Sequence, residues 1–125
     1  MKYLILIYSN PASRAVWEGL SDAQRAEGLQ RYAALNEDLA ASGELIVAEA
    51  LADPSLATRV SVRAGRTMTT DGPFAEAKEH LAGFYLIECE GLDRAVEHAA
   101  RVPEAAYGLV EVRPVLDLNG LGLDM

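Results

Sequence analysis

Residues 2–8, Lys2-Tyr3-Leu4-Ile5-Leu6-Ile7-Tyr8, are the stretch from which the fold of this chain is predicted. A short run of leucine, isoleucine and tyrosine that ends at a Ser-Asn-Pro turn signal is typical of a β-strand. Successive side chains of a strand point to opposite faces, so this strand is apolar on both. Residues 83–89, Gly83-Phe84-Tyr85-Leu86-Ile87-Glu88-Cys89, predict a second strand of this kind. We therefore expect both faces of the sheet to be covered.

Two long helices are predicted from capping signals and from apolar residues at helical spacing. Ser21 and Gln24 form a capping box, and Gly43 supplies a stop, which together predict a helix from about Asp22 to Ser42. Trp17 lies just upstream and favours a short lead-in helix. Apolar residues between Leu92 and Ala100 predict the second long helix, which ends before a proline.

Three further segments complete the predicted strands. Residues 44–51 form one strand, 58–63 and 66–70 form a hairpin, and 109–114 form an edge strand because it alternates and ends in proline. A β-α-β unit, a hairpin and a second β-α-β unit predict an α+β, ferredoxin-like βαββαβ plan, with the hairpin and a short helix over residues 75–80 inserted. We expect one domain over residues 1–114 and a poorly specified C-terminal tail over 115–125.

The predicted plan leaves one face of the sheet without helices. Two helices cover a single face, whereas the strands at 2–8 and 83–89 are apolar on both. An exposed apolar sheet face is costly, and a second copy of the same sheet is the simplest cover. The pattern therefore predicts a face-to-face homodimer with two-fold symmetry.

Composition excludes several classes of function. The chain has 125 residues and a formal net charge of −8, which disfavours binding to nucleic acids or to anionic membranes. One cysteine and two histidines predict neither a disulfide within the chain nor a metal site, and no glycine-rich cofactor motif is present. No cofactor is expected. No targeting signal or membrane-length apolar run appears, so we expect a cytoplasmic protein.

The segment from Thr69 to Tyr85 has the densest set of groups that could carry chemistry. Asp71 precedes the predicted short helix, and Glu76 and His80 lie within that helix. A carboxylate beside a histidine orients the ring and stabilises its cation, as proton transfer requires. An architectural interpretation is open too, and the local pattern alone favours it. In that interpretation Asp71 caps the helix, Gly72-Pro73 shapes the turn and Phe74 packs.

Residues 70–79, Thr-Asp-Gly-Pro-Phe-Ala-Glu-Ala-Lys-Glu, and residues 82–88 closely resemble the signature of the DGPF branch of the YCII-related family. Residues 2–8 and 110–114 are similar to the same family, so the resemblance spans nearly the whole chain. It implies a dimeric α+β barrel and a small-ligand pocket between sheet and loops, in a family without a settled activity. Genes for extracytoplasmic-function sigma factors often lie beside such proteins, which implies a regulatory protein-interaction module as the alternative function.

The resemblance and the residue pattern together predict a pocket beside this motif. Asp71 is the candidate catalytic residue, and the candidate ligand-binding residues are Tyr32, Glu49, Gly72, Pro73, Phe74, Glu76 and His80. Related proteins outside this branch often have a histidine on the first helix that is proposed to act with an aspartate. This chain has none between Met1 and Glu79, and Tyr32 is the nearest substitute. A tyrosine with a pKa of about 10 is a poor general base but a good hydrogen-bond donor.

Other polar residues have a structural and a functional interpretation, and both stay open. Glu49 is an edge-strand residue or a pocket carboxylate. Tyr32 on an apolar stripe is typical of a core tyrosine with a satisfied hydroxyl. His98 shares a predicted helix face with two arginines and is expected to be solvated. The arginines of the hairpin fit an anion site or, more commonly, a solvated strand edge; they are Arg59, Arg63 and Arg66.

Overall fold

The strand over residues 2–8 lies inside a four-stranded antiparallel sheet, as predicted. In the computed structural model, which describes residues 1–121, β1 (Lys2–Ser9) pairs with β5 (His80–Glu88) and with β6 (Val110–Pro114). β2 (Leu45–Ala50) pairs with the other side of β5, so the strand order is β2-β5-β1-β6. β6 is an edge strand, as its proline predicts.

The helices form where the capping box and the apolar spacing predict them. α1 (Pro11–Gly19) contains Trp17, α2 spans Asp22–Ser42 and α3 spans Leu92–Ala99. The Ser21–Gln24 capping box is present, and Gly43 ends α2 with a φ of +77°, in the left-handed region that glycine adopts without strain. Short 3₁₀ turns lie at η1 (Pro54–Leu56), η2 (Pro103–Tyr107) and η3 (Asn119–Leu121).

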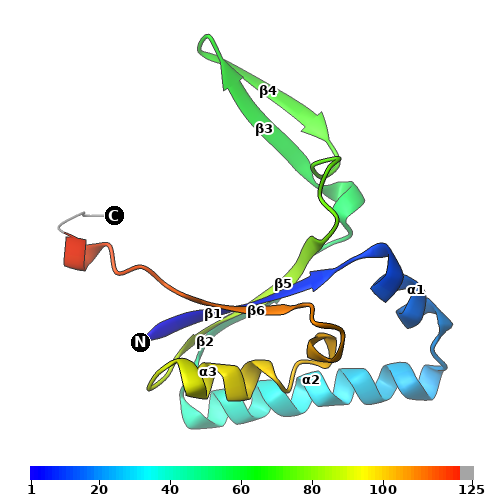
Figure 1. Cartoon of the computed structure of the whole chain (residues 1–125), viewed down its shortest axis with the longest axis vertical. Coiled ribbons are helices and arrows are strands. Elements are labelled where there is room, and N and C mark those ends of the chain that lie inside the picture. The colour runs from blue at the N-terminus through cyan, green and yellow to red at the C-terminus, as the bar shows by residue number, and fades with distance from the viewer. Residues whose placement is uncertain (122–125) are drawn as a thin grey trace.

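The core lies between one face of the sheet and the helices α2 and α3 (Figure 1). Odd-numbered residues of β1 and β5 point to this face, where Ile5 and Ile87 pack with Leu35 and Leu39 of α2 and are fully buried. Burial of each such side chain stabilises the fold by roughly 1.5–3 kcal/mol. The apolar face of α2 and the inward-facing side chains of β1 and β5 therefore form a single apolar layer.

The opposite face of the sheet carries no helix of the described chain (Figure 1). Strand register places even-numbered residues of β1 and β5 on this face, together with alternate residues of β2. We call this the open face, and its apolar members are Leu4, Leu6, Val47, Phe84 and Leu86. The hairpin and the C-terminal segment both extend from the body on this side (Figure 1).

The predicted hairpin forms a sheet of its own. β3 (Thr58–Arg63) pairs with β4 (Arg66–Asp71), and Ala64 and Gly65 turn between them with φ values of +49° and +76°. The hairpin projects away from the body and leaves Val60 and Val62 of β3 exposed (Figure 1).

The prediction of a short helix over residues 75–80 is wrong. The segment forms turns, of which one is closed by a hydrogen bond from the Ala77 N–H to the Phe74 carbonyl (3.1 Å), and His80 already begins β5. Helix nucleation is unfavourable, and a segment of six residues that leads directly into a strand is too short to repay it. Asp71 ends β4 and is exposed, so it has no helix to cap.

The predicted tail is only partly described. Val115 donates its backbone N–H to the carbonyl of Lys2 (3.0 Å), which continues the edge of the sheet by one bond, and η3 follows. Residues 122–125 of the predicted tail lie outside the described residues. Across residues 1–121, we find no helix with the length and apolarity needed to cross a membrane.

Candidate functional site

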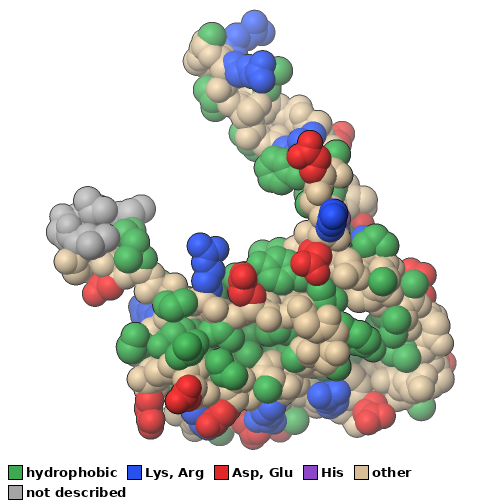
Figure 2. Space-filling view, in the orientation of Figure 1, with side chains coloured by type: hydrophobic (Ala, Val, Ile, Leu, Met, Phe, Trp, Pro, Cys, Tyr) green, Lys and Arg blue, Asp and Glu red, His purple; other side chains and the backbone are tan. Residues whose placement is uncertain are grey.

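A hollow of about 620 Å³ lies where the base of the hairpin meets η1 and the start of β5. Three residues of the predicted set, Pro73, Phe74 and His80, line this hollow, which we call the motif hollow. Most of its other lining residues are apolar, and its polar side chains come mainly from η1, β3 and the segment before β5: Asp53, Thr58, Arg59 and Glu79. Hydrophobic side chains also gather at the base of the hairpin in Figure 2.

Glycine is required at position 72 by the shape of the turn. Gly72 has a φ of +86°, a region that L side chains rarely adopt, and its N–H donates to the Ala57 carbonyl at 2.7 Å. This bond ties the Asp-Gly-Pro-Phe turn to the start of β3. The turn then presents Phe74, whose side chain is 68% exposed, to the Arg59 guanidinium at 5.4 Å from the ring centre.

Arg59 has an unusual environment within the motif hollow. Its Nε is buried and has no hydrogen-bond partner among the described residues. A buried donor without a partner is destabilising, and such groups are uncommon in folded proteins. A ligand with an acceptor group would satisfy this donor, and the flanking Phe74 ring offers the ligand an apolar surface.

Asp53, a carboxylate outside the motif, lines the motif hollow together with His80. The pKa of Asp53 lies below its ordinary value, chiefly because Ser55 donates its backbone N–H (2.9 Å) and its hydroxyl. The positive charges of Arg14 and His80 lower this pKa further. The sequence analysis missed Asp53, because an Asp-Pro-Ser turn after a strand is an ordinary 3₁₀ cap and gives no functional signal.

The remaining predicted residues do not join this hollow. Asp71 ends β4, and Glu76 lies in the following turns; both are exposed. Tyr32 and Glu49 line a different hollow of about 380 Å³ between α2 and the sheet, which we call the α2 hollow. The structure therefore splits the predicted set: some members line the motif hollow, Tyr32 and Glu49 line the α2 hollow, and Asp71, Gly72 and Glu76 line neither.

The α2 hollow holds a pair of polar contacts that sequence reasoning missed. The Tyr32 hydroxyl donates to Glu104 of η2, and the Tyr85 hydroxyl donates to Asn36 Oδ1 at 2.6 Å. Burial raises the pKa of Glu104 above its ordinary value, although its own backbone N–H and Arg31 oppose this change. Burial also raises the pKa of Tyr85. Nothing in the Pro-Glu-Ala-Ala sequence around Glu104 marks it as a partner of a residue 72 positions away.

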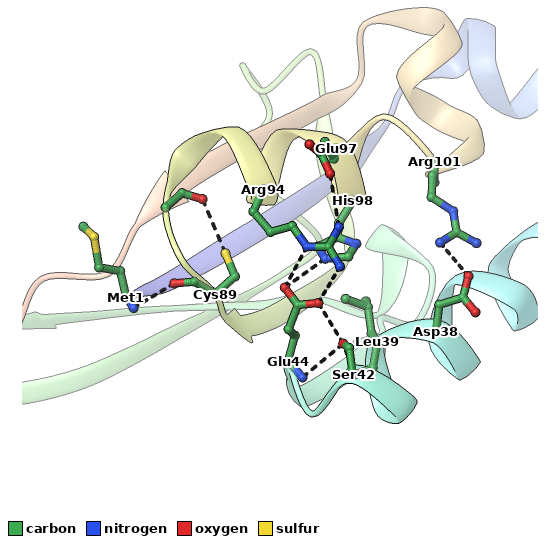
Figure 3. A network of polar contacts seen from close by, with 11 residues as sticks. Met1, Asp38, Leu39, Ser42, Glu44, Cys89, Arg94, Glu97, His98 and Arg101 are labelled. Atoms are coloured by element: carbon green, nitrogen blue, oxygen red, sulfur yellow. Dashed lines mark hydrogen bonds and ion pairs between the residues drawn. The ribbon is translucent and has the colours of Figure 1, made fainter.

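A third polar cluster joins α3 to the turn between α2 and β2 (Figure 3). Glu44 accepts hydrogen bonds from Arg94 at 3.1 and 3.0 Å, and its Oε2 lies 3.1 Å from His98 Nε2. The expectation that His98 is solvated is wrong, because its exposed fraction is 4%. His98 shares its helix face with Arg94, and both side chains reach Glu44. Arg94 above all, followed by Ser42 and His98, holds the pKa of Glu44 at about 2.

Metal ligation finds no support in the described part of the chain. No group of three or more histidine, cysteine, aspartate or glutamate side chains is close enough to hold an ion among residues 1–121. Cys89 is buried just after β5 and lies near the N-terminus, whose ammonium donates to the Cys89 carbonyl at 2.9 Å. It is a core residue that holds the start of β1.

Comparison with known proteins matches almost the whole chain to one family model. Residues 1–119 match the family model described as the YCII-related domain. An uncharacterized protein of Rhizobium meliloti (strain 1021) is 34% identical over 117 residues, which cover 92% of each chain. The match extends over the sheet, the helices and both hollows.

Proposed function

From the premise that this chain belongs to the YCII-related domain family, we propose that it is a homodimeric protein that binds a small molecule in the motif hollow. We assign it to the DGPF branch on the basis of Asp71-Gly72-Pro73-Phe74. Arg59 and His80 supply the polar contacts to the ligand, and Phe74 supplies an apolar one. The observation that carries the proposal is the buried Nε of Arg59, which has no partner among the described residues, in a mostly apolar hollow.

The chemistry of the hollow favours a largely apolar ligand with an acceptor group. Ligand sites in proteins are commonly concave and apolar, with a few convergent polar groups, and a volume near 620 Å³ is ample for a small metabolite. The acceptor would pair with Arg59, which can hold it as a charge-assisted hydrogen bond. His80 beside the Asp53 carboxylate is suited to exchange a proton with the same ligand.

Two features of the structure support the homodimer. The open face exposes an apolar surface that water covers only at a cost. The hairpin is an isolated pair of strands, which is marginally stable in water, and its exposed Val60, Val62 and Met68 require a packing surface. A second copy seated on the open face would cover both, because the hairpin extends from the body on that side (Figure 1).

A ligand screen by thermal shift tests the binding proposal. Compounds that stabilise the wild-type protein should lose most of their effect on Phe74→Ala and on Arg59→Gln, because a ligand raises stability only in proportion to its occupancy. Arg63→Gln, an exposed arginine of the same strand, is the matched control and should respond as the wild type does. Stabilisation that survives both hollow substitutions would place the ligand elsewhere and contradict the proposal.

A further inference from the structure

We propose that the α2 hollow is a second binding site, which takes a small apolar amine whose ammonium group pairs with Glu104. It lies on the helix side of the sheet and does not depend on the motif hollow. The argument uses the space that small side chains leave beside α2, the polar groups that converge on it, and the sign of the charges around it.

Small residues create the space. Register places Ala48 and Ala50 of β2 beside Tyr85 and Gly83 of β5, opposite the α2 residues that line the hollow. Gly83 is required here, because a Cβ on it would lie 2.9 Å from the Glu49 carbonyl oxygen. At Ala48, Ala50 and Gly83 the sheet therefore offers only methyl groups and backbone where a core would usually have larger side chains. The result is a hollow of about 380 Å³ instead of packed side chains.

The polar groups of the hollow are mostly acceptors. The Tyr32 hydroxyl donates its hydrogen to Glu104 and the Tyr85 hydroxyl donates to Asn36. Each hydroxyl oxygen can therefore still accept a hydrogen bond from a ligand. Glu104 keeps further lone pairs on its carboxylate. An ammonium or primary amine has up to three donor hydrogens and complements this set, whereas a carboxylate has none to offer.

Charge points to the same class of ligand. Among the described residues that line the α2 hollow there is no lysine, arginine or histidine, and the titratable ones are Tyr32, Glu49, Tyr85 and Glu104. Alternation on β2 turns the Glu49 side chain to the open face, which leaves Glu104 as the charge that faces the hollow. Arg31 acts on Glu104 from the neighbouring groove between α1 and α2. An anion would meet the carboxylate of Glu104 in a half-buried site and is disfavoured.

Protonation provides an independent signature. In the free protein, burial raises the pKa of Glu104. A bound cation favours the charged carboxylate and lowers that pKa, so binding and deprotonation of Glu104 favour each other. The affinity for an amine should therefore rise from acidic to neutral pH. The other titratable groups around the site are Tyr32 and Tyr85, which line the hollow, and Arg31, which acts on Glu104 from the neighbouring groove.

The test uses benzylamine as the probe, with benzyl alcohol and benzoate as neutral and anionic matches of the same shape. NMR titration of the labelled wild-type protein should give amide shifts at Tyr32, Ala48 and Gly83 with benzylamine, at a Kd of about 1 mM. Benzyl alcohol and benzoate should bind at least about tenfold more weakly. Equal affinity for benzoate, or no shift at about 10 mM benzylamine, overturns the proposal.

Two substitutions and one control complete the experiment. Glu104→Gln should weaken benzylamine at least about tenfold and remove the rise of affinity with pH. Ala48→Leu fills the hollow without touching Glu104 and should also abolish the shifts, so the test holds even where the first variant fails to fold. Glu37→Gln, an exposed acid on the outer side of α2, should bind as the wild type does. Wild-type affinity in folded Glu104→Gln or in Ala48→Leu contradicts the site.

Discussion

The guanidinium of Arg59 lies 5.4 Å from the centre of the Phe74 ring, and this pair joins the first strand of the hairpin to the Asp-Gly-Pro-Phe turn. A cation over an exposed aromatic ring stabilises by about 0.5–1 kcal/mol, which is small for a contact between two distant segments. The Arg59 Nε nevertheless stays buried without a partner. The contact therefore contributes little to the stability of the hairpin, whereas the Arg59 Nε is a hydrogen-bond donor that a ligand can pair with.

Asp71 is expected to tolerate substitution. Because Asp71 is exposed at the end of β4 and no helix follows it, Asp71→Ala and Asp71→Asn should each change the free energy of unfolding by less than about 0.5 kcal/mol. Urea denaturation of the two variants measures this. A loss of about 1 kcal/mol in the alanine variant alone would indicate that the carboxylate does cap the turn.

Gly83 and Gly28 should respond in opposite directions to alanine. A Cβ on Gly83 would meet the Glu49 carbonyl oxygen at 2.9 Å, so Gly83→Ala forces β2 and β5 apart and should cost about 1–3 kcal/mol. A Cβ on Gly28 meets only the Trp17 ring at 3.6 Å, and alanine in a helix is favoured by about 0.5–1 kcal/mol. Thermal and urea unfolding of both variants compare the two effects. A stabilised Gly83→Ala variant would refute the close approach.

Glu44 gives the fold a stabilising term that depends on pH. Its pKa is about 2 in the folded protein against an ordinary 4.5, so its contribution is fully present above pH 4.5 and is lost as the pH falls toward 2. Glu44→Gln leaves Arg94 and His98 without their charged acceptor and should cost about 1–3 kcal/mol at neutral pH. The difference from the wild type should shrink as the pH is lowered through that range.

Asp38 supplies the control for the Glu44 measurement. It pairs with Arg101 at 2.7 Å, but both side chains are largely exposed, so Asp38→Asn should change stability by less than about 1 kcal/mol. Urea unfolding of both variants from pH 7 to pH 3 provides the data. If the loss of unfolding free energy in Glu44→Gln stays constant over the whole pH range, the carboxylate charge contributes nothing to stability.

The homodimer proposal predicts the effect of a charge on the open face. Leu6→Asp would place an unpaired carboxylate in the interface and should weaken dimerisation at least about a hundredfold. Val96→Asp, at an exposed apolar residue of α3 on the other side of the molecule, should not. Sedimentation equilibrium at micromolar concentration distinguishes them. A wild-type protein that stays monomeric there, or a Leu6→Asp protein that dimerises normally, would contradict the proposal.

The elements of the main sheet and its helices were predictable because local signals and tertiary packing agree. The Ser21 capping box and Gly43 bound α2 at both ends, and the apolar run of β1 pairs with a strand on each side. The short helix over residues 75–80 failed for the opposite reason. Its helix-forming residues lie next to β5, which begins at His80. The pairing of β5 with β1 outweighs the weak helix propensity of so short a segment.

The candidate site was only partly predictable. The motif placed Pro73, Phe74 and His80 in one hollow, but Asp53 and Arg59 join it through the path of the chain around the hairpin. Glu104 pairs with Tyr32 across 72 residues, and His98 is drawn inward by Glu44 across 54. Single polar residues carry no sequence periodicity, so contacts of this kind emerge only from the assembled fold.

A crystal structure of the wild-type protein soaked with the compound that gives the largest thermal shift tests the central claim most directly. The account predicts density for that compound in the motif hollow, with an acceptor atom within hydrogen-bond distance of Arg59 Nε and its apolar part against Phe74. A compound bound on the open face, with the motif hollow empty, would contradict it.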